Sequence, residues 1–137
     1  LRGASRVVAV EVDPRAAVRL RSNLARNRVE GVTVLEERAT RLEPYVAAMD
    51  RLAGGAGAGP LVLKMDIEGD EEPLIENSAD SVVQRFHHIV LEYHRGPDRC
   101  LTRLRALGYS LHWDPPLEHP NGDRCGLIWA DRDTPAS

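Results

Sequence analysis

The chain has few of the residues that mark several large classes of protein. Its 137 residues include one Phe, three Tyr and two Trp, so it has no set of aromatic side chains on which nucleic-acid bases would stack. Its 18 lysines and arginines are scattered among 21 aspartates and glutamates, and the net charge is -3. This composition predicts neither a nucleic-acid partner nor an anionic membrane surface.

Long hydrophobic runs and cysteine motifs are also missing. No apolar run approaches the roughly 20 residues of a membrane-spanning helix, and the N-terminus lacks the basic-then-apolar layout of a signal peptide. The two cysteines, Cys100 and Cys125, do not form a C-x-x-C pair, which favours free thiols over a zinc or redox motif. We therefore expect a soluble cytoplasmic protein whose length suits a single domain.

What the chain does contain is an alternation of strand and helix patterns. Residues 6–14 form a β-branched run that ends in Asp-Pro, which predicts a buried strand and then a helix capped by Asp13. Apolar residues at three- and four-residue spacing extend this helix to about Asn27. A second strand is predicted at residues 32–35, and a helix at residues 45–52.

Residues 54–60, GGAGAGP, invite confusion with a nucleotide-binding loop. Such a loop needs a strand before it and a helix after it, and here the predicted order is reversed. We therefore interpret this segment as a surface connection. The apolar run at residues 61–67 predicts a third strand that is central and covered on both faces.

The second half of the chain continues the alternation. A helix is predicted at residues 70–77, with a further helical piece through Val82, Val83 and Phe86, and a fourth strand at residues 88–94. Another helix presents an apolar face made of Cys100, Leu101, Leu104 and Leu107, and Gly108 closes it. Residues 109–113 and 126–130 predict an antiparallel pair of strands. The pattern as a whole predicts an α/β three-layer domain with a mostly parallel sheet.

Acidic residues gather at the predicted strand ends. Glu11 ends the first strand, Asp66 and Glu68 follow the third, and Glu92 and His94 end the fourth. Open parallel sheets bind ligands outside the carboxyl ends of their strands. A carboxylate in the position of Glu11 is suited to accept the hydroxyl protons of a ribose, although it also suits a solvent-facing strand end.

Five segments together resemble a known family. They are K-M-D-I-E-G-D-E at residues 64–71, I-V-L-E-Y-H at 89–94, L-R-A-L-G-Y at 104–109, A-V-E-V-D-P at 9–14 and S-N-L-A-R-N at 22–27. In order and approximate spacing they resemble the FkbM family of S-adenosylmethionine-dependent methyltransferases. Val12 departs from the family, which commonly has proline directly after the acid.

The resemblance implies a class I Rossmann-like fold that transfers a methyl group from S-adenosylmethionine to a hydroxyl of a small molecule or sugar. It implies that Glu11 holds the cofactor ribose and that Asp66 lies near the methyl group and the acceptor. His94 is the alternative catalytic base, because imidazole exchanges protons near neutral pH, and Glu68 and Glu92 are supporting residues.

The resemblance also implies a strand, a glycine-rich loop and most of a helix before Leu1, with residues 1–5 as the tail of that helix. On this reading the chain is part of a methyltransferase domain, and we expect it to bind S-adenosylmethionine weakly or not at all by itself.

Other uses of the acidic strand ends stay open. A divalent metal ion held by Asp66, Glu92 and His94 would bind the acceptor hydroxyl, but metal is not the favoured interpretation. A metal-dependent hydrolase and a non-catalytic partner-binding module are the alternative functions. The three acids at residues 70–72 are interpreted as exposed acids of a first helical turn, and residues 114–124 as a loop able to form a lid.

Overall fold

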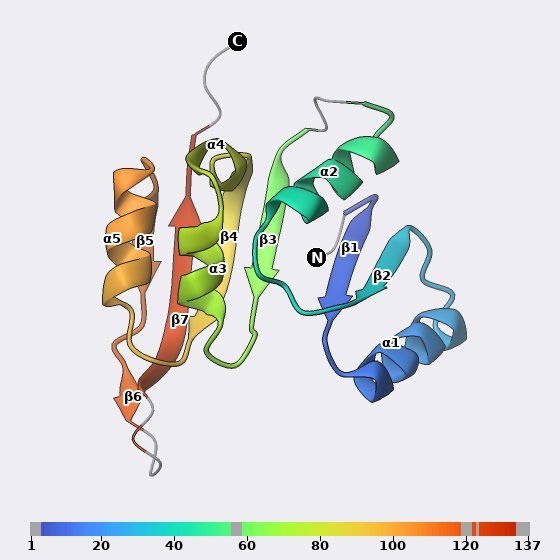
Figure 1. Ribbon diagram of the computed structural model, residues 1–137, viewed down its shortest axis with the longest axis horizontal. Helices are drawn as coiled ribbons and strands as arrows, with labels where there is room; N and C mark the ends of the chain where they lie inside the picture. The colour runs from blue at the N-terminus through green and yellow to red at the C-terminus, as the bar shows by residue number, and fades with distance from the viewer. Residues whose placement is uncertain (1–3, 56–58, 119–121, 123, 134–137) are drawn as a thin grey trace. The chain divides into compact units, whose positions relative to one another are not determined.

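The computed structural model describes residues 4–55, 59–118, 122 and 124–133 (Figure 1). The chain divides into two compact units, each described by itself below. Unit 1 is Leu1–Ala39 with Pro44–Ala58, and unit 2 is Thr40–Glu43 with Gly59–Ser137. The single partial domain stays a prediction. No helix in the described ranges is long and apolar enough to cross a membrane.

Unit 1 begins with a strand, a helix and a second strand. The elements are β1 (Val7–Glu11), α1 (Pro14–Arg26), β2 (Val32–Glu36) and most of α2 (Glu43–Leu52). The side chain of Asp13 caps α1 by accepting the Arg15 N–H at 2.9 Å, and Asn27 ends the helix. The predicted strand, cap and helix are therefore confirmed. β1 pairs in parallel with β2 and is half-buried along its whole length, so the expectation of a buried strand is wrong.

The residues just before β1 are not helical. Ala4 and Ser5 are described outside any helix, which contradicts the predicted helix tail as far as these two residues are concerned; residues 1–3 lie outside the described part. The backbone at Ser5 passes close to Gly31. A Cβ at Gly31 would lie 2.6 Å from the Ser5 carbonyl oxygen, and its φ of 76° also favours glycine.

Unit 2 contains a sheet in which all strands but one run in the same direction. Its elements are β3 (Leu61–Met65), α3 (Glu71–Asn77), α4 (Asp80–Val83), β4 (Phe86–Tyr93), α5 (Asp98–Ala106), β5 (Ser110–Trp113), β6 (Leu117–Glu118) and β7 (Arg124–Asp131). The strand order is β3-β4-β7-β5, and β6 also pairs with β7. β3 and β4 are parallel, whereas β7 is antiparallel to β4, β5 and β6 (Figure 1). The mostly parallel sheet with an antiparallel C-terminal strand is confirmed.

The third strand differs from its prediction. β3 ends at Met65, two residues before the predicted boundary, and stands at the end of the sheet, where β4 is its partner. Leu61 and Met65 are buried, but Val62 between them is 47% exposed. A continuous apolar run is typical of a strand covered on both faces. Val62 is apolar but exposed, and β3 is an edge strand of this sheet. The prediction of a central strand covered on both faces is therefore wrong.

The core of unit 2 lies between the sheet and the helices α3 and α5, which contact each other (Figure 1). Alternate residues of β4 are buried, as expected for a strand with one well-covered face. Phe86 begins β4 rather than ending a helix, because α4 stops at Val83 and Gln84 caps it. Full burial of one aliphatic side chain, such as Leu104 or Ile128, contributes about 1.5 to 3 kcal/mol.

Two predicted loops are described in part. Residues 56–58 of the glycine run and residues 119–121 and 123 of the proposed lid lie outside the described residues. Gly108, with a φ of 88°, follows α5 as predicted. The two cysteines are free thiols, also as predicted.

Candidate functional site

Two strand ends of unit 2 meet at one edge of the sheet. β3 and β4 are parallel neighbours, with Met65 opposite Leu91, so the residues after the two strands emerge on the same side. Asp66 follows β3 directly, and His94 follows β4 directly. The predicted convergence of these two side chains is what the register of the strands produces.

The loop after β3 turns sharply because of two consecutive left-handed residues. Glu68 has a φ of 57° and Gly69 a φ of 100°. A Cβ at Gly69 would also lie 3.4 Å from the Arg95 guanidinium, so this position suits glycine on two grounds. The loop directs the backbone N–H groups of Ile67 and Gly69 inward, toward the start of α3.

Glu71 receives both of these N–H groups. The Ile67 N–H donates to Glu71 Oε1 at 3.1 Å, and the Gly69 N–H donates to Oε1 and Oε2 at 3.2 Å and 3.0 Å. Glu71 is 2% exposed. Backbone N–H groups converging on an anion form the kind of concavity that stabilises a carboxylate. The interpretation of Glu71 as an exposed helix-turn acid is therefore wrong, although the residue does stand in the first turn of α3.

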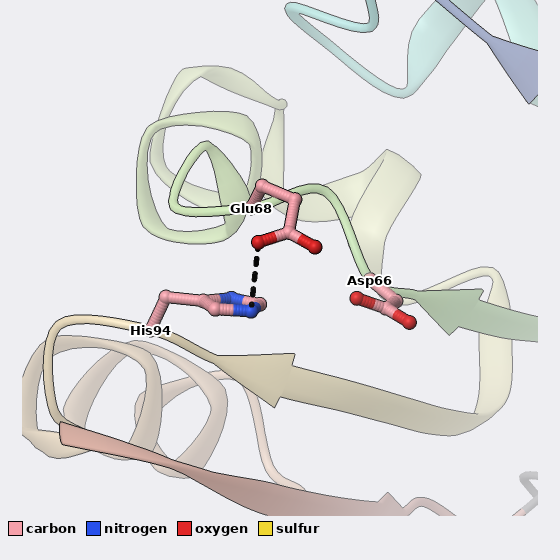
Figure 2. Close-up of side chains that lie close together, drawn as sticks. All are labelled: Asp66, Glu68 and His94. Atoms are coloured by element: carbon pink, nitrogen blue, oxygen red, sulfur yellow. Dashed lines mark ion pairs between the residues drawn. The ribbon is translucent and has the colours of Figure 1, made fainter. Parts of the chain in front are cut away.

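His94 lies between two glutamates. Its Nε2 is 3.5 Å from Glu68 Oε2 (Figure 2). Its Nδ1 is 2.9 Å from Glu71 Oε1. The His94 side chain is 14% exposed, whereas that of Glu68 is 86% exposed. One ring nitrogen therefore faces the buried interior and the other faces the accessible side of the loop.

Asp66 has a more open environment. Its side chain is 40% exposed, and Oδ2 lies 3.6 Å from Lys64 Nζ. An exposed pair of this kind stabilises a protein by at most about 1 kcal/mol. The carboxylate is consequently accessible to a ligand that approaches the edge of the sheet.

Asp66, Glu68 and His94 also form a set of metal-ligand type. One ligand atom from each lies within 4.8 Å of the others (Figure 2). Glu92, which the sequence grouped with Asp66 and His94, lies within β4 and does not belong to this set. With metal–ligand distances of about 2.1 Å, neighbouring ligand atoms lie about 3 to 3.5 Å apart, a spacing that His94 Nε2 and Glu68 Oε2 have at 3.5 Å. A metal here stays a prediction that is not favoured.

Two other ionisable side chains near His94, those of Tyr93 and Cys100, are affected by burial. The Tyr93 side chain reaches β7, where a Cβ on Gly126 would lie 2.4 Å from the Tyr93 hydroxyl oxygen. The Tyr93 hydroxyl donates to the Asp114 carbonyl at 2.9 Å. Burial raises the pKa of Tyr93, and it raises the pKa of the Cys100 thiol to about 12. Both groups therefore stay protonated near neutral pH and serve packing rather than proton transfer.

Glu11 belongs to unit 1. Its Oε1 accepts the Asp13 N–H at 2.8 Å, so the carboxylate is fixed at the turn between β1 and α1. Glu11 is half-buried, and Oε2 is not the oxygen that this contact engages. This local geometry suits the hydroxyl-accepting role that the sequence predicts for Glu11.

Glu71 is the residue that sequence reasoning missed. The signal was present in the spacing, because Glu71 lies within the same K-M-D-I-E-G-D-E segment as Asp66 and Glu68. A run of acids at a helix start masked it, because Asp70, Glu71 and Glu72 look alike in sequence. Only the loop geometry distinguishes the buried one.

The chain has an α/β fold with a mostly parallel sheet, and two solved structures have a similar fold. A candidate methyltransferase from Streptococcus mutans, solved in complex with SAH, is 12% identical, with a TM-score of 0.56 over 91% of this chain and 76% of that one. TYW2 from M. jannaschii, solved with AdoMet, is 14% identical, with a TM-score of 0.52 over 94% of this chain and 59% of that one. No protein-family model and no curated sequence matches the chain.

Proposed function

We propose that this chain is part of an S-adenosylmethionine-dependent methyltransferase of the FkbM family that methylates a hydroxyl oxygen of a small molecule or sugar. The carrying observation is the convergence of Asp66 and His94 at the carboxyl edge of parallel strands, within a fold similar to two proteins solved with SAH or AdoMet. The sequence motifs supply the family assignment, since fold similarity at 12% and 14% identity does not.

Glu11 is the proposed cofactor ligand of unit 1. Its Oε1 is engaged by the Asp13 N–H, which fixes the carboxylate, and Oε2 is available to a ribose hydroxyl. The residues therefore fit a nucleoside-containing cofactor at this strand end. The glycine-rich loop that such folds use for the remainder of the cofactor is proposed to precede Leu1.

Asp66 and His94 are the proposed acceptor-side residues of unit 2, with Glu68 and Glu92 as supporting acids. S-Adenosylmethionine supplies an electrophilic methyl group on a positively charged sulfur. The protein has to align the acceptor oxygen with that methyl group and remove the hydroxyl proton. The accessible carboxylate of Asp66 is suited to orient the hydroxyl, and His94 to accept its proton. The proposed partner is thus a small hydroxyl compound in the cytoplasm, with no nucleic acid or membrane involved.

The test is calorimetric titration with S-adenosylmethionine and with S-adenosylhomocysteine. Two proteins are compared: the 137-residue chain and the product extended upstream of Leu1 by its coding sequence. We expect micromolar affinity for the extended product and an affinity at least about tenfold weaker for the chain alone. An extended product with a folded domain and no affinity for either compound would overturn the proposal and favour a non-catalytic module.

A further inference from the structure

The two nitrogens of His94 are in unequal surroundings. Nδ1 lies 2.9 Å from the buried Glu71, which is a hydrogen-bond distance. Nε2 lies 3.5 Å from the exposed Glu68 (Figure 2), which is longer than a good hydrogen bond. In a neutral imidazole, one nitrogen carries the proton and the other accepts. The hydrogen-bond partners of the ring decide which nitrogen carries the proton.

Glu71 determines which His94 nitrogen carries the proton, because of its contacts with backbone N–H groups. Backbone N–H groups only donate, so the Ile67 and Gly69 N–H groups require acceptor oxygens on Glu71. Three such contacts together engage both oxygens of the Glu71 side chain as acceptors. A carboxylate that already accepts from the backbone also accepts from His94, so Nδ1 carries the proton. Nε2 is then left as the basic nitrogen, on the accessible side.

We infer that Glu71 is a positioning residue that holds His94 as its Nδ1–H tautomer, so that Nε2 accepts the hydroxyl proton of the methyl acceptor. The inference rests on the proposed function and assigns the base within it. The acceptor O–H bond breaks, its proton goes to Nε2, and the oxygen's electron pair forms the bond to the methyl carbon. The carbon–sulfur pair stays on sulfur, which becomes a neutral thioether, and the imidazolium later releases its proton to water.

The same geometry explains why His94, rather than Asp66, is the base. Imidazole exchanges protons near neutral pH, where a base is most effective, whereas an exposed carboxylate is a weak base. Asp66 is also paired with Lys64. The charged groups around His94 are Glu71 on α3, Asp66 and Glu68 on the loop after β3, and Arg95 next in sequence. Glu68, with its accessible side chain, is the group that an acceptor hydroxyl would displace from Nε2.

The test is ¹⁵N NMR of the imidazole ring in the wild type and in Glu71→Leu. This variant removes the oxygen that accepts the Nδ1 proton, while Glu68 stays near Nε2, so the proton moves to Nε2. We expect the Nδ1–H signature in the wild type at neutral pH and the Nε2–H signature in the variant. Glu72→Leu, which removes the neighbouring acid paired with Arg99, is the matched control and should keep the wild-type signature.

A chemical readout accompanies the spectra. Diethyl pyrocarbonate acylates an unprotonated, accessible imidazole nitrogen, and peptide mass mapping reports the rate at His94. We expect acylation of His94 to be at least about tenfold slower in Glu71→Leu than in the wild type or in Glu72→Leu. Because the NMR spectrum of the wild type decides the tautomer, the inference stays testable even where a variant fails to fold.

An Nε2–H signature in the wild type, or equal acylation rates in wild type and Glu71→Leu, would overturn the inference. These measurements use the protein without cofactor. Failure to bind S-adenosylmethionine would therefore overturn the proposed function while leaving the tautomer result intact, and the two failures are distinguishable.

Discussion

Glu11 in unit 1 and Glu71 in unit 2 are both acids near a strand end, but their surroundings differ. Glu11 is half-buried, and its Oε1 accepts the backbone N–H of Asp13, two residues later in the chain. Glu71 is buried and accepts from two backbone N–H groups and from His94. The first arrangement suits the binding role that we propose for Glu11, and the second suits the positioning role that we infer for Glu71.

Replacing the two acids by alanine is the strongest way to break this comparison. Glu71→Ala leaves two backbone N–H groups and the His94 N–H without an acceptor inside the protein, and we expect a loss of about 3 kcal/mol in unfolding free energy. Glu11→Ala loses one contact at the surface and should cost about 0.5 kcal/mol. Urea denaturation measures both. Equal losses would show that Glu71 has no organising role.

A second comparison concerns glycines of unit 2. In Gly126→Ala the new Cβ would meet the Tyr93 hydroxyl at 2.4 Å, and relief of that overlap requires movement of a buried ring. We expect a loss of about 2 kcal/mol. Gly59→Ala is the control, because nothing lies within 4 Å of a Cβ there, and it should change stability by less than about 0.5 kcal/mol. Thermal unfolding of both variants gives the answer; an unchanged Gly126→Ala protein would contradict the packing of Tyr93.

Tyr109 predicts how the stability depends on alkaline pH. Its hydroxyl contacts the Val83 and Phe86 carbonyls at 2.7 Å and 2.6 Å, and burial raises its pKa from 10.0 to about 12. Because the folded pKa is the higher one, the stabilisation is complete below about pH 10 and is lost as the pH rises toward about 12.

Tyr109→Phe should therefore cost about 1 kcal/mol near neutral pH. It should also make the decline in unfolding free energy between about pH 10 and pH 12 shallower. Urea denaturation at a series of pH values measures both effects. A decline as steep as that of the wild type would show that Tyr109 does not contribute to it. The remaining slope includes Cys100, whose pKa burial also raises to about 12.

The smallest expected effect is that of a chelator. The Asp66, Glu68 and His94 set is open, with two exposed carboxylates, and is not the favoured site of a metal ion. We expect the melting temperature and the S-adenosylmethionine affinity of the extended product to be unchanged in EDTA. Loss of affinity in EDTA, restored by a divalent ion, would assign His94 Nε2 to a metal and not to a proton.

The sequence predicted the alternation of strands and helices because local signals carry it. Asp13 caps α1 and Gly108 follows α5, and both are readable from residue type and position. Strand neighbours are not local. Val62 lies in a continuous apolar run, yet it is exposed, because burial depends on which elements pack on a strand.

The candidate site was also predictable only in part. Parallel strand ends meet at one edge, so Asp66 and His94 could be placed together from sequence. The role of Glu71 could not, since it depends on the left-handed backbone of Glu68 and Gly69, which turns two N–H groups onto one carboxylate. Glu92 illustrates the reverse error: its position in the chain suggested a ligand, whereas the set within reach includes Glu68 instead.

The central claim is that Glu11 binds the cofactor whereas His94 acts on the acceptor. Calorimetric titration of S-adenosylmethionine into the extended product, compared with its Glu11→Gln and His94→Ala variants, tests it most directly. We predict an affinity about tenfold weaker for Glu11→Gln and within about twofold of the wild type for His94→Ala. An undiminished affinity in Glu11→Gln, or an equal loss in both variants, would contradict the claim.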